Sequence, residues 1–279
     1  MPRRARCALL LILLATPVAA GAQASGGARE MRLAVEPVLE RSGLLERLLP
    51  AFEAAHGVRV VVRVLAAKDA LELGASGGTD LVWVSAPRAQ VQYLNQGFYL
   101  DRRLVVSTDH VLVGPPGDPA GVRGSPDTAT AFRRIGQKKA AYVSCRAPMA
   151  SYAVEQEIWK RTRLTPTPPW YVRVESGHDA VVLAADRGGY TLVDRSTAQP
   201  LIDQGRLQIV LANMQPLRRG FHVMEVNPNR FPGANYRDAK ALADYLVSPA
   251  AQEIIHGLAA SRPGTPDLLP GAGPRAPHS

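Results

Sequence analysis

The chain has 279 residues, a formal net charge of +9, 46% hydrophobic residues and two cysteines. Its basic residues are mostly arginine and never occur more than two or three in succession, which excludes a continuous basic stripe for nucleic acid. From this composition we expect a globular protein whose partners do not include nucleic acid.

Residues 1–24 have the pattern of an export signal. Three arginines precede an apolar run that ends in Ala22-Gln23-Ala24, a small-x-small cleavage pattern. The run is shorter than the roughly 20 residues of a membrane-spanning helix. We predict that residues 1–24 are removed and that the rest, with a formal charge of +6, is a soluble periplasmic protein. Cys145 is then the only cysteine, which excludes an internal disulfide and a cysteine-based metal cluster.

The first part of the mature chain alternates β-branched strands with amphipathic helices. Leucines and Phe52 form one apolar face of a helix that begins after Ser42 and ends at Gly57. Pro87 suits the first turn of a further helix, which Gly97 ends. The expected strands are 32–37, 58–65, 80–87 and 109–113, and the expected helices are 43–56, 69–74 and 87–97.

The turn-rich segment Pro115–Gly121 interrupts this pattern, and a second strand–helix series follows it. The expected helices are 125–139, 150–163, 179–187 and 197–204, and the expected strands are 141–144, 171–174, 190–193 and 207–211. The chain then returns with a strand at 221–226 and helices at 236–247 and 249–257. We predict a discontinuous lobe 31–114 and 219–260, a continuous lobe 115–218, and a loosely ordered tail 261–279.

This order predicts the α/β class: two α/β lobes around a ligand cleft. In parallel α/β units, ligands bind at loops beyond the carboxyl ends of strands. The loops to consider follow Val35, Val84, Val143 and Val193. A cleft between two lobes is also the usual place for a small ligand.

Several segments match one known family in order. They are SGLL at 42–45, ASGGTDLVWVSAP at 75–87, QGFYLDRRLVVSTDHVLVGPPGDPAG at 96–121, YTLVDRSTAQP at 190–200 and SPAAQEII at 248–255. From Met31 to Gly257 the chain resembles the tungstate-binding proteins of ABC transporters, a branch of the type II periplasmic-binding-protein fold. The resemblance implies a periplasmic solute-binding component of an importer for a tungstate- or molybdate-like oxyanion. It also implies an inner-membrane ABC permease as partner, a monomer, no cofactor and no enzymatic activity.

In that family hydroxyls, backbone N–H groups and an arginine hold the oxyanion between the lobes. Here Glu36-Pro37-Val38-Leu39 replaces a hydroxyl-rich loop, which adds a negative charge and removes one N–H. A second family motif is replaced by 144–152, where Cys145 takes the arginine position and Arg146 follows it. The ligand-binding residues that the resemblance implies are Ser85, Ser144, Cys145, Arg146, Asp194, Arg195 and Thr197.

Two of these residues have a second interpretation. Asp194 and Arg195 either contact the ligand or belong to an ion pair that braces their loop. Glu155 and Glu157 are expected to be solvated rather than a catalytic pair, because two residues apart they point to different faces of a helix. The histidines show no metal-ligand spacing, and no nucleophile-elbow pattern indicates a hydrolase.

The altered loops leave three alternatives to oxyanion transport. The more apolar loops suit a small organic solute with Arg146 or Arg195 as its counter-charge. A degenerate family member could act instead as an interaction or sensory protein. A thiol-dependent activity at Cys145 predicts a reactive thiol that ligand suppresses.

Overall fold

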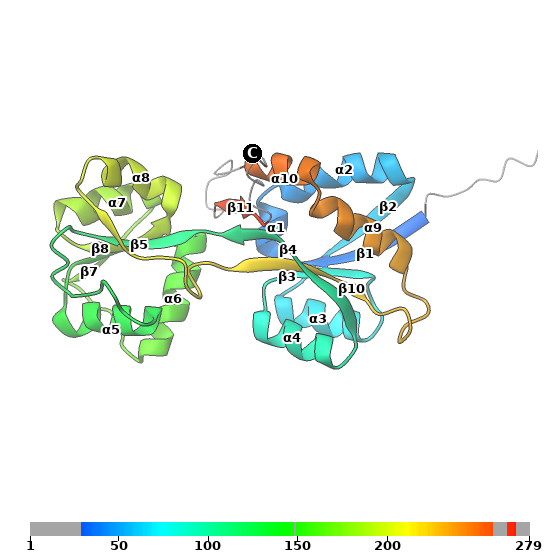
Figure 1. Cartoon of the computed structure of the whole chain (residues 1–279). Helices are drawn as coiled ribbons and strands as arrows, with labels where there is room; N and C mark the ends of the chain where they lie inside the picture. Colours follow the sequence, from blue (N-terminus) through cyan, green and yellow to red (C-terminus); the bar gives the residue numbers. More distant parts are fainter. Residues whose placement is uncertain (1–28, 148, 259–266, 272–279) are drawn as a thin grey trace, which may run out of the picture.

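The computed structural model describes residues 29–147, 149–258 and 267–271. Within them, two β-sheets, each covered by helices on both faces, lie end to end (Figure 1). We call the part around the six-stranded sheet lobe 1 and the part around the five-stranded sheet lobe 2. The predicted signal peptide, 1–24, lies outside the described residues.

Lobe 1 has a mixed sheet with the strand order β11-β4-β10-β3-β1-β2. β1 runs parallel to β2 and β3, whereas β10 is antiparallel to β3 and β4. Central strand β3 is buried throughout, as its apolar sequence LVWV requires. The strands are β1 (Arg29–Val35), β2 (Val58–Val64), β3 (Leu81–Val84), β4 (Tyr99–Thr108), β10 (Gly220–Val226) and β11 (Leu268–Pro270).

The helices of lobe 1 cover both faces of this sheet (Figure 1). Phe52 and the leucines of α2 are buried on one face, which confirms the predicted apolar side of that helix. Gly57 ends α2 with a φ of 59°, a conformation that glycine adopts without strain. On one face lie α1 (Pro37–Arg41), α2 (Leu44–His56), α9 (Tyr236–Leu246) and α10 (Pro249–His256), and on the other α3 (Ala67–Ala75) and α4 (Pro87–Asn95).

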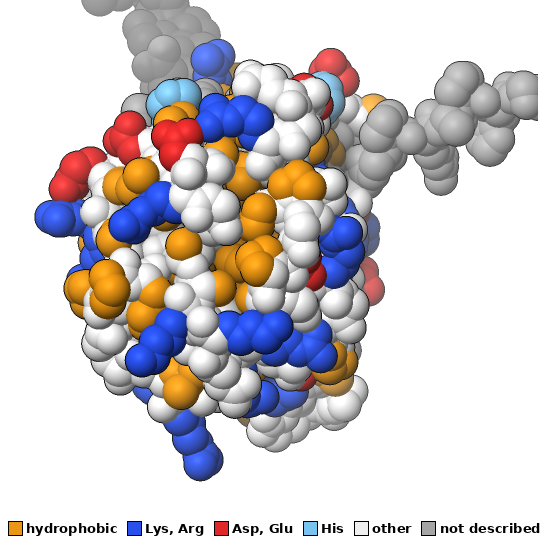
Figure 2. Space-filling model, turned by 90° about the vertical axis from the view of Figure 1, so that its left-hand side faces the viewer, with side chains coloured by type: hydrophobic (Ala, Val, Ile, Leu, Met, Phe, Trp, Pro, Cys, Tyr) orange, Lys and Arg blue, Asp and Glu red, His pale blue; other side chains and the backbone are white. Residues whose placement is uncertain are grey.

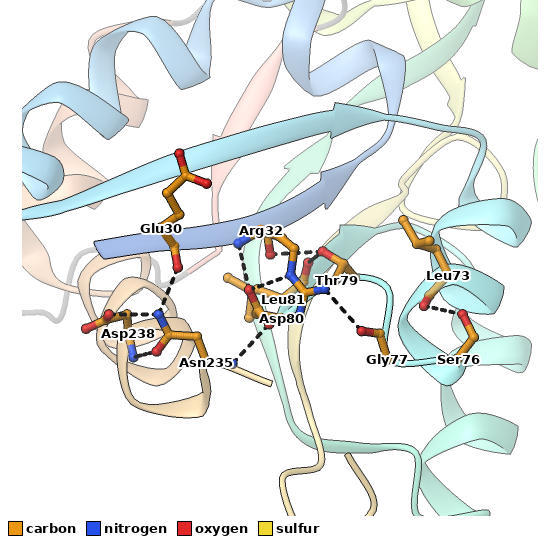
Figure 3. A network of polar contacts seen from close by, with 10 residues as sticks. All are labelled: Glu30, Arg32, Leu73, Ser76, Gly77, Thr79, Asp80, Leu81, Asn235 and Asp238. Carbon is orange, nitrogen blue, oxygen red and sulfur yellow. Dashed lines mark hydrogen bonds and ion pairs between the residues drawn. The ribbon is translucent and has the colours of Figure 1, made fainter. Parts of the chain in front are cut away.

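A polar network joins β1, the start of β3 and the start of α9 (Figure 3). The buried Asp80 carboxylate accepts hydrogen bonds from the Arg32 backbone N–H at 2.7 Å and from the Asn235 N–H at 3.0 Å. It also pairs with the Arg32 guanidinium, at 2.5 Å. Because its acceptors are satisfied from three directions, Asp80 fixes these elements at the amino end of the lobe-1 strands.

Lobe 2 repeats the layered arrangement with the strand order β7-β6-β8-β5-β9. β6, β7 and β8 run parallel, and β5 is antiparallel to β8. Its strands are β5 (His110–Gly114), β6 (Tyr142–Cys145), β7 (Tyr171–Val174), β8 (Tyr190–Asp194) and β9 (Gln208–Leu211). Helices α5 (Thr128–Lys138) and α6 (Ala150–Thr162) pack on one face, and α7 (Gly177–Asp186) and α8 (Arg195–Asp203) on the other.

Two adjacent segments connect the lobes. The chain passes from β4 to β5 at Thr108–His110 and returns before β10, and the segments pair where the Thr108 N–H donates to the Arg219 carbonyl at 3.0 Å. The predicted crossing at Pro115–Gly121 was therefore wrong, because β5 belongs to the lobe-2 sheet. The turn residues 115–121 follow a strand inside lobe 2, whereas the first hinge segment, Thr108–His110, has no turn residues.

The C-terminal segment also differs from the prediction. Leu268–Pro270, which the sequence placed in a loosely ordered tail, forms edge strand β11 against β4. Pro270 is tolerated there because an edge strand need not donate on both sides. No helix in the described ranges is both long and apolar enough to cross a membrane.

Candidate functional site

The carboxyl ends of the parallel strands of both lobes face each other across the hinge. β5 enters lobe 2 from the hinge and is antiparallel to β8, so β6, β7 and β8 all end on the hinge side. β10 begins at the hinge and is antiparallel to β3, so β1 and β3 also end there. Because ligands bind beyond the carboxyl ends of such strands, the facing ends form the candidate site (Figure 1).

Glu36 and Ser85 form the lobe-1 side of this site. Glu36 follows β1, and its Oε1 accepts a short hydrogen bond from the backbone N–H of Ser85, which follows β3. Burial raises the pKa of the Glu36 carboxyl, whereas the Ser85 N–H and the charge of Arg219 lower it. A carboxylate thus takes up a backbone donor that an anion could otherwise use.

An ion pair braces the hinge on the lobe-2 side. Arg195, the first residue of α8, places its Nε 2.6 Å from Oδ2 of Asp109, which lies between β4 and β5. The Arg195 N–H also donates to the Asp109 carbonyl at 3.1 Å. The geometry therefore agrees with the bracing interpretation of Arg195, since its guanidinium already has a buried carboxylate partner.

Asp194 lies beside this pair in a buried acidic group. Its Oδ1 accepts the Asp267 N–H at 3.1 Å, and the Asp267 carboxylate accepts the Ser196 N–H at the start of α8 at 3.2 Å. Burial, together with the charge of Asp267, raises the pKa of Asp194 to about 7. Burial lowers the pKa of the neighbouring His110 to about 4. No group of three or more His, Cys, Asp or Glu side chains within the described ranges is placed to hold a metal ion.

Ser144 and Cys145 lie inside lobe 2 rather than at the cleft surface. Both are buried in β6, and the Ser144 hydroxyl donates to the carbonyl of Cys145 at 2.9 Å. Cys145 packs in an apolar cluster, and burial raises the pKa of its thiol to about 11. The prediction that these side chains bind ligand is therefore not supported by their placement. Thr197, in the first turn of α8, is half-buried beside Gly177.

The expectation that Glu155 is solvated was wrong. Its side chain is buried under α6, where its Oε1 accepts hydrogen bonds from the Tyr171 hydroxyl at 2.8 Å and the Trp159 indole at 3.1 Å. Burial raises the pKa of Glu155 to about 7. Only Glu157 behaves as predicted, since it forms an i,i+4 pair with Arg161 on the surface.

Arg146 lines an open pocket of about 440 Å³ at the hinge-facing end of lobe 2, together with Ala147, Tyr152 and Arg173. The Arg173 guanidinium lies 6.0 Å from the centre of the Tyr152 ring and 5.4 Å from that of Tyr171. Arg146 pairs with Glu175 at 3.2 Å, but both side chains are more than half exposed, so this pair is weak. The pocket is lined by two guanidinium groups and one tyrosine side chain, and these groups can together bind an anion.

A second open pocket of about 480 Å³ lies at the opposite end of lobe 2. Lys139, Ala141, Pro169, Trp170 and Arg187 line it, at the segments that precede β6, β7 and β8. Figure 2 shows this end of the molecule, where hydrophobic side chains gather centrally above a band of Lys and Arg. Because it lies at the amino ends of the strands, this pocket is not part of the site between the lobes.

The structure brings together only part of the predicted set. Ser85, Arg146, Asp194 and Arg195 all lie at facing strand ends, as expected. Sequence reasoning missed the roles of Asp109, Arg173 and Asp267. Arg173 could have been found, because it lies one residue from the carboxyl end of β7, which pairs with β6. Asp267 carried no signal, since it lies in a Pro/Gly-rich tail.

The two-lobed architecture with its site between facing strand ends is that of a binding protein. The chain belongs to the family described as bacterial extracellular solute-binding proteins, whose model matches residues 40–257. Its fold is therefore the predicted type II periplasmic-binding-protein fold, and the members of its family bind solutes rather than catalyse reactions.

Known relatives confirm the resemblance to tungstate-binding proteins. A putative ABC transporter anion-binding protein of Haloferax volcanii is 33% identical over 244 residues, covering 85% of this chain and 71% of the relative. The tungstate-binding protein TupA of Peptoclostridium acidaminophilum is 28% identical over 234 residues, covering 83% and 82%. The solved TupA of Desulfovibrio alaskensis G20 superposes with a TM-score of 0.61 at 27% identity, covering 88% of this chain and 100% of that one.

Proposed function

We propose that this chain binds a small solute with an anionic group between its lobes in the periplasm and delivers it to an ABC permease. Its relatives support this function, since they include an ABC transporter anion-binding protein and TupA proteins. The observation that carries the proposal is the pocket in which Arg146 and Arg173 converge with Tyr152 at the hinge-facing end of lobe 2. Closure about the hinge segments would bring lobe 1 over this pocket.

Tungstate and molybdate are the first solutes to test, because two relatives are named for tungstate. A small organic anion is the second candidate. It is favoured by Glu36, whose carboxylate occupies the Ser85 N–H and would repel a doubly charged oxyanion.

The experiment is a thermal-shift and calorimetric titration of the purified protein with tungstate, molybdate, sulfate, phosphate and a set of small carboxylates. A solute that binds only the folded protein must raise its melting temperature. Substituting either pocket arginine in R146Q or R173Q should weaken binding by about ten-fold or more, since a charge-assisted contact is lost. R161Q is the matched control, because Arg161 is an exposed arginine of α6 that pairs with Glu157.

The outcomes separate the candidates. Binding of tungstate that both pocket variants weaken supports an oxyanion, and binding of carboxylates alone supports the organic solute. If folded protein binds neither these anions nor amino acids, which also carry a carboxylate, the transport proposal fails and the interaction or sensory alternative gains support.

A further inference from the structure

Lobe 1 presents a hydrogen-bond acceptor to the cleft where an anion-binding site needs donors. The Ser85 N–H is already donated to Oε1 of Glu36, and Pro37, the next residue, has no N–H. The other carboxylate oxygen of Glu36, Oε2, has no partner within the described ranges and is not sealed from solvent. A ligand group that meets this oxygen must therefore donate hydrogen bonds.

A positive charge lies close to the same carboxylate. Arg219, in the hinge segment before β10, acts electrostatically on Glu36 but forms no ion pair with it in the described part of the chain. Both side chains are half-buried. Because Glu36 and Arg219 do not pair with each other, each can contact the oppositely charged end of a dipolar ligand.

We propose that the solute is a small organic zwitterion whose ammonium group donates to Glu36 and whose carboxylate meets the arginines of the cleft. This inference rests on the proposed function, because the carboxylate end uses the pocket of Arg146 and Arg173. A dianion is disfavoured, since Glu36 repels negative charge at the lobe-1 side. Glu36 is then the residue that sets the charge of the ligand.

Three pairs of compounds that differ only in the ammonium group test the proposal. They are glycine and acetate, β-alanine and propionate, and 4-aminobutyrate and butyrate, with tungstate and sulfate added as simple oxyanions. Binding is measured by calorimetry at one pH near neutrality. We expect at least one amino acid to bind ten-fold or more tightly than its matched acid.

Two variants test whether Glu36 causes the preference for an amino acid over its matched acid. E36Q keeps an oxygen acceptor for the Ser85 N–H but loses the charge, so the ratio of amino acid to matched acid should fall to near one. E40Q is the matched control, because Glu40 is an exposed acid of α1, the helix that begins directly after Glu36. It should leave the ratio unchanged.

Three results would overturn the inference: acids that bind as tightly as amino acids, a preference that survives E36Q, or binding of tungstate or sulfate without any amino acid. The last result would leave the proposed function intact. If no compound binds to protein shown to be folded, both the inference and the proposed function fail.

Discussion

The Arg195 guanidinium and the Asp109 carboxylate form an ion pair that ties helix α8 to the hinge, with 2.6 Å between Nε and Oδ2. The Asp109 side chain is 7% exposed and the Arg195 side chain 34%. A charge held so deeply depends on its partner, because water cannot replace the lost contact.

Substitution D109N should therefore destabilise the protein by about 2 kcal/mol, less than for a fully buried pair because Arg195 remains partly solvated. Urea unfolding measures this change. The matched control is D186N, which removes the exposed pair with Arg206 and should cost no more than about 0.5 kcal/mol. Equal effects of the two substitutions would show that the hinge pair has no special role.

Glu155 should be needed for the stability of lobe 2. E155A leaves the Tyr171 hydroxyl and the Trp159 indole without their buried acceptor, which should cost about 3 kcal/mol. E157A, two residues away on the surface of α6, should change stability by about 0.5 kcal/mol or less. Denaturant unfolding of both variants provides the measurement, and a small effect of E155A would contradict the buried network.

Asp194 should make stability depend on pH. Its pKa of about 7 lies above the ordinary value of an aspartate, so the native state holds the proton more tightly than the unfolded chain. The resulting stabilisation is complete below about pH 4 and is lost as the pH rises towards 7. His110, with a pKa of about 4, is neutral over most of this range, and Asp109 and Asp267 supply the negative charges nearby.

The stability of D194N relative to the unsubstituted protein should thus increase by roughly 2 kcal/mol between pH 5 and 7. Unfolding titrations at several pH values give this difference directly. D203N, at the exposed end of α8, the helix that follows Asp194, is the control and should show no such trend. A pH-independent difference for D194N would mean that Asp194 is already ionised at pH 5.

Cys145 should be unreactive in the native protein. Its thiol is buried and has a pKa of about 11, so little thiolate is present or accessible at pH 8. In protein lacking residues 1–24, we expect labelling by a thiol-specific disulfide reagent to be at least about 100-fold slower than in guanidinium chloride. Rapid labelling that a ligand suppresses would instead support the thiol-dependent alternative.

The sequence alone determined the local elements and the type of protein. Apolar periodicity, the stop at Gly57 and the β-branched run of β2 depend only on neighbouring residues, and they predicted most of the alternating strands and helices. Strand β4 and the short helix α1 were missed. The strand ends indicated the loops of the site. The ordered motifs indicated the family, and the resemblance to it implied Ser85, Arg146, Asp194 and Arg195 as residues near the site.

Only the tertiary structure decided which side chains are available to a ligand. The Asp109–Arg195 and Asp267–Ser196 contacts join residues 86 and 71 positions apart, and no local pattern encodes such pairs. Ser144 and Cys145 are buried because helices cover both faces of β6, and the burial of Glu155 depends on which face of α6 packs inward. The hinge was misplaced for the same reason, because membership of a sheet is set by hydrogen bonding between distant strands, whereas turn residues report only on the local backbone.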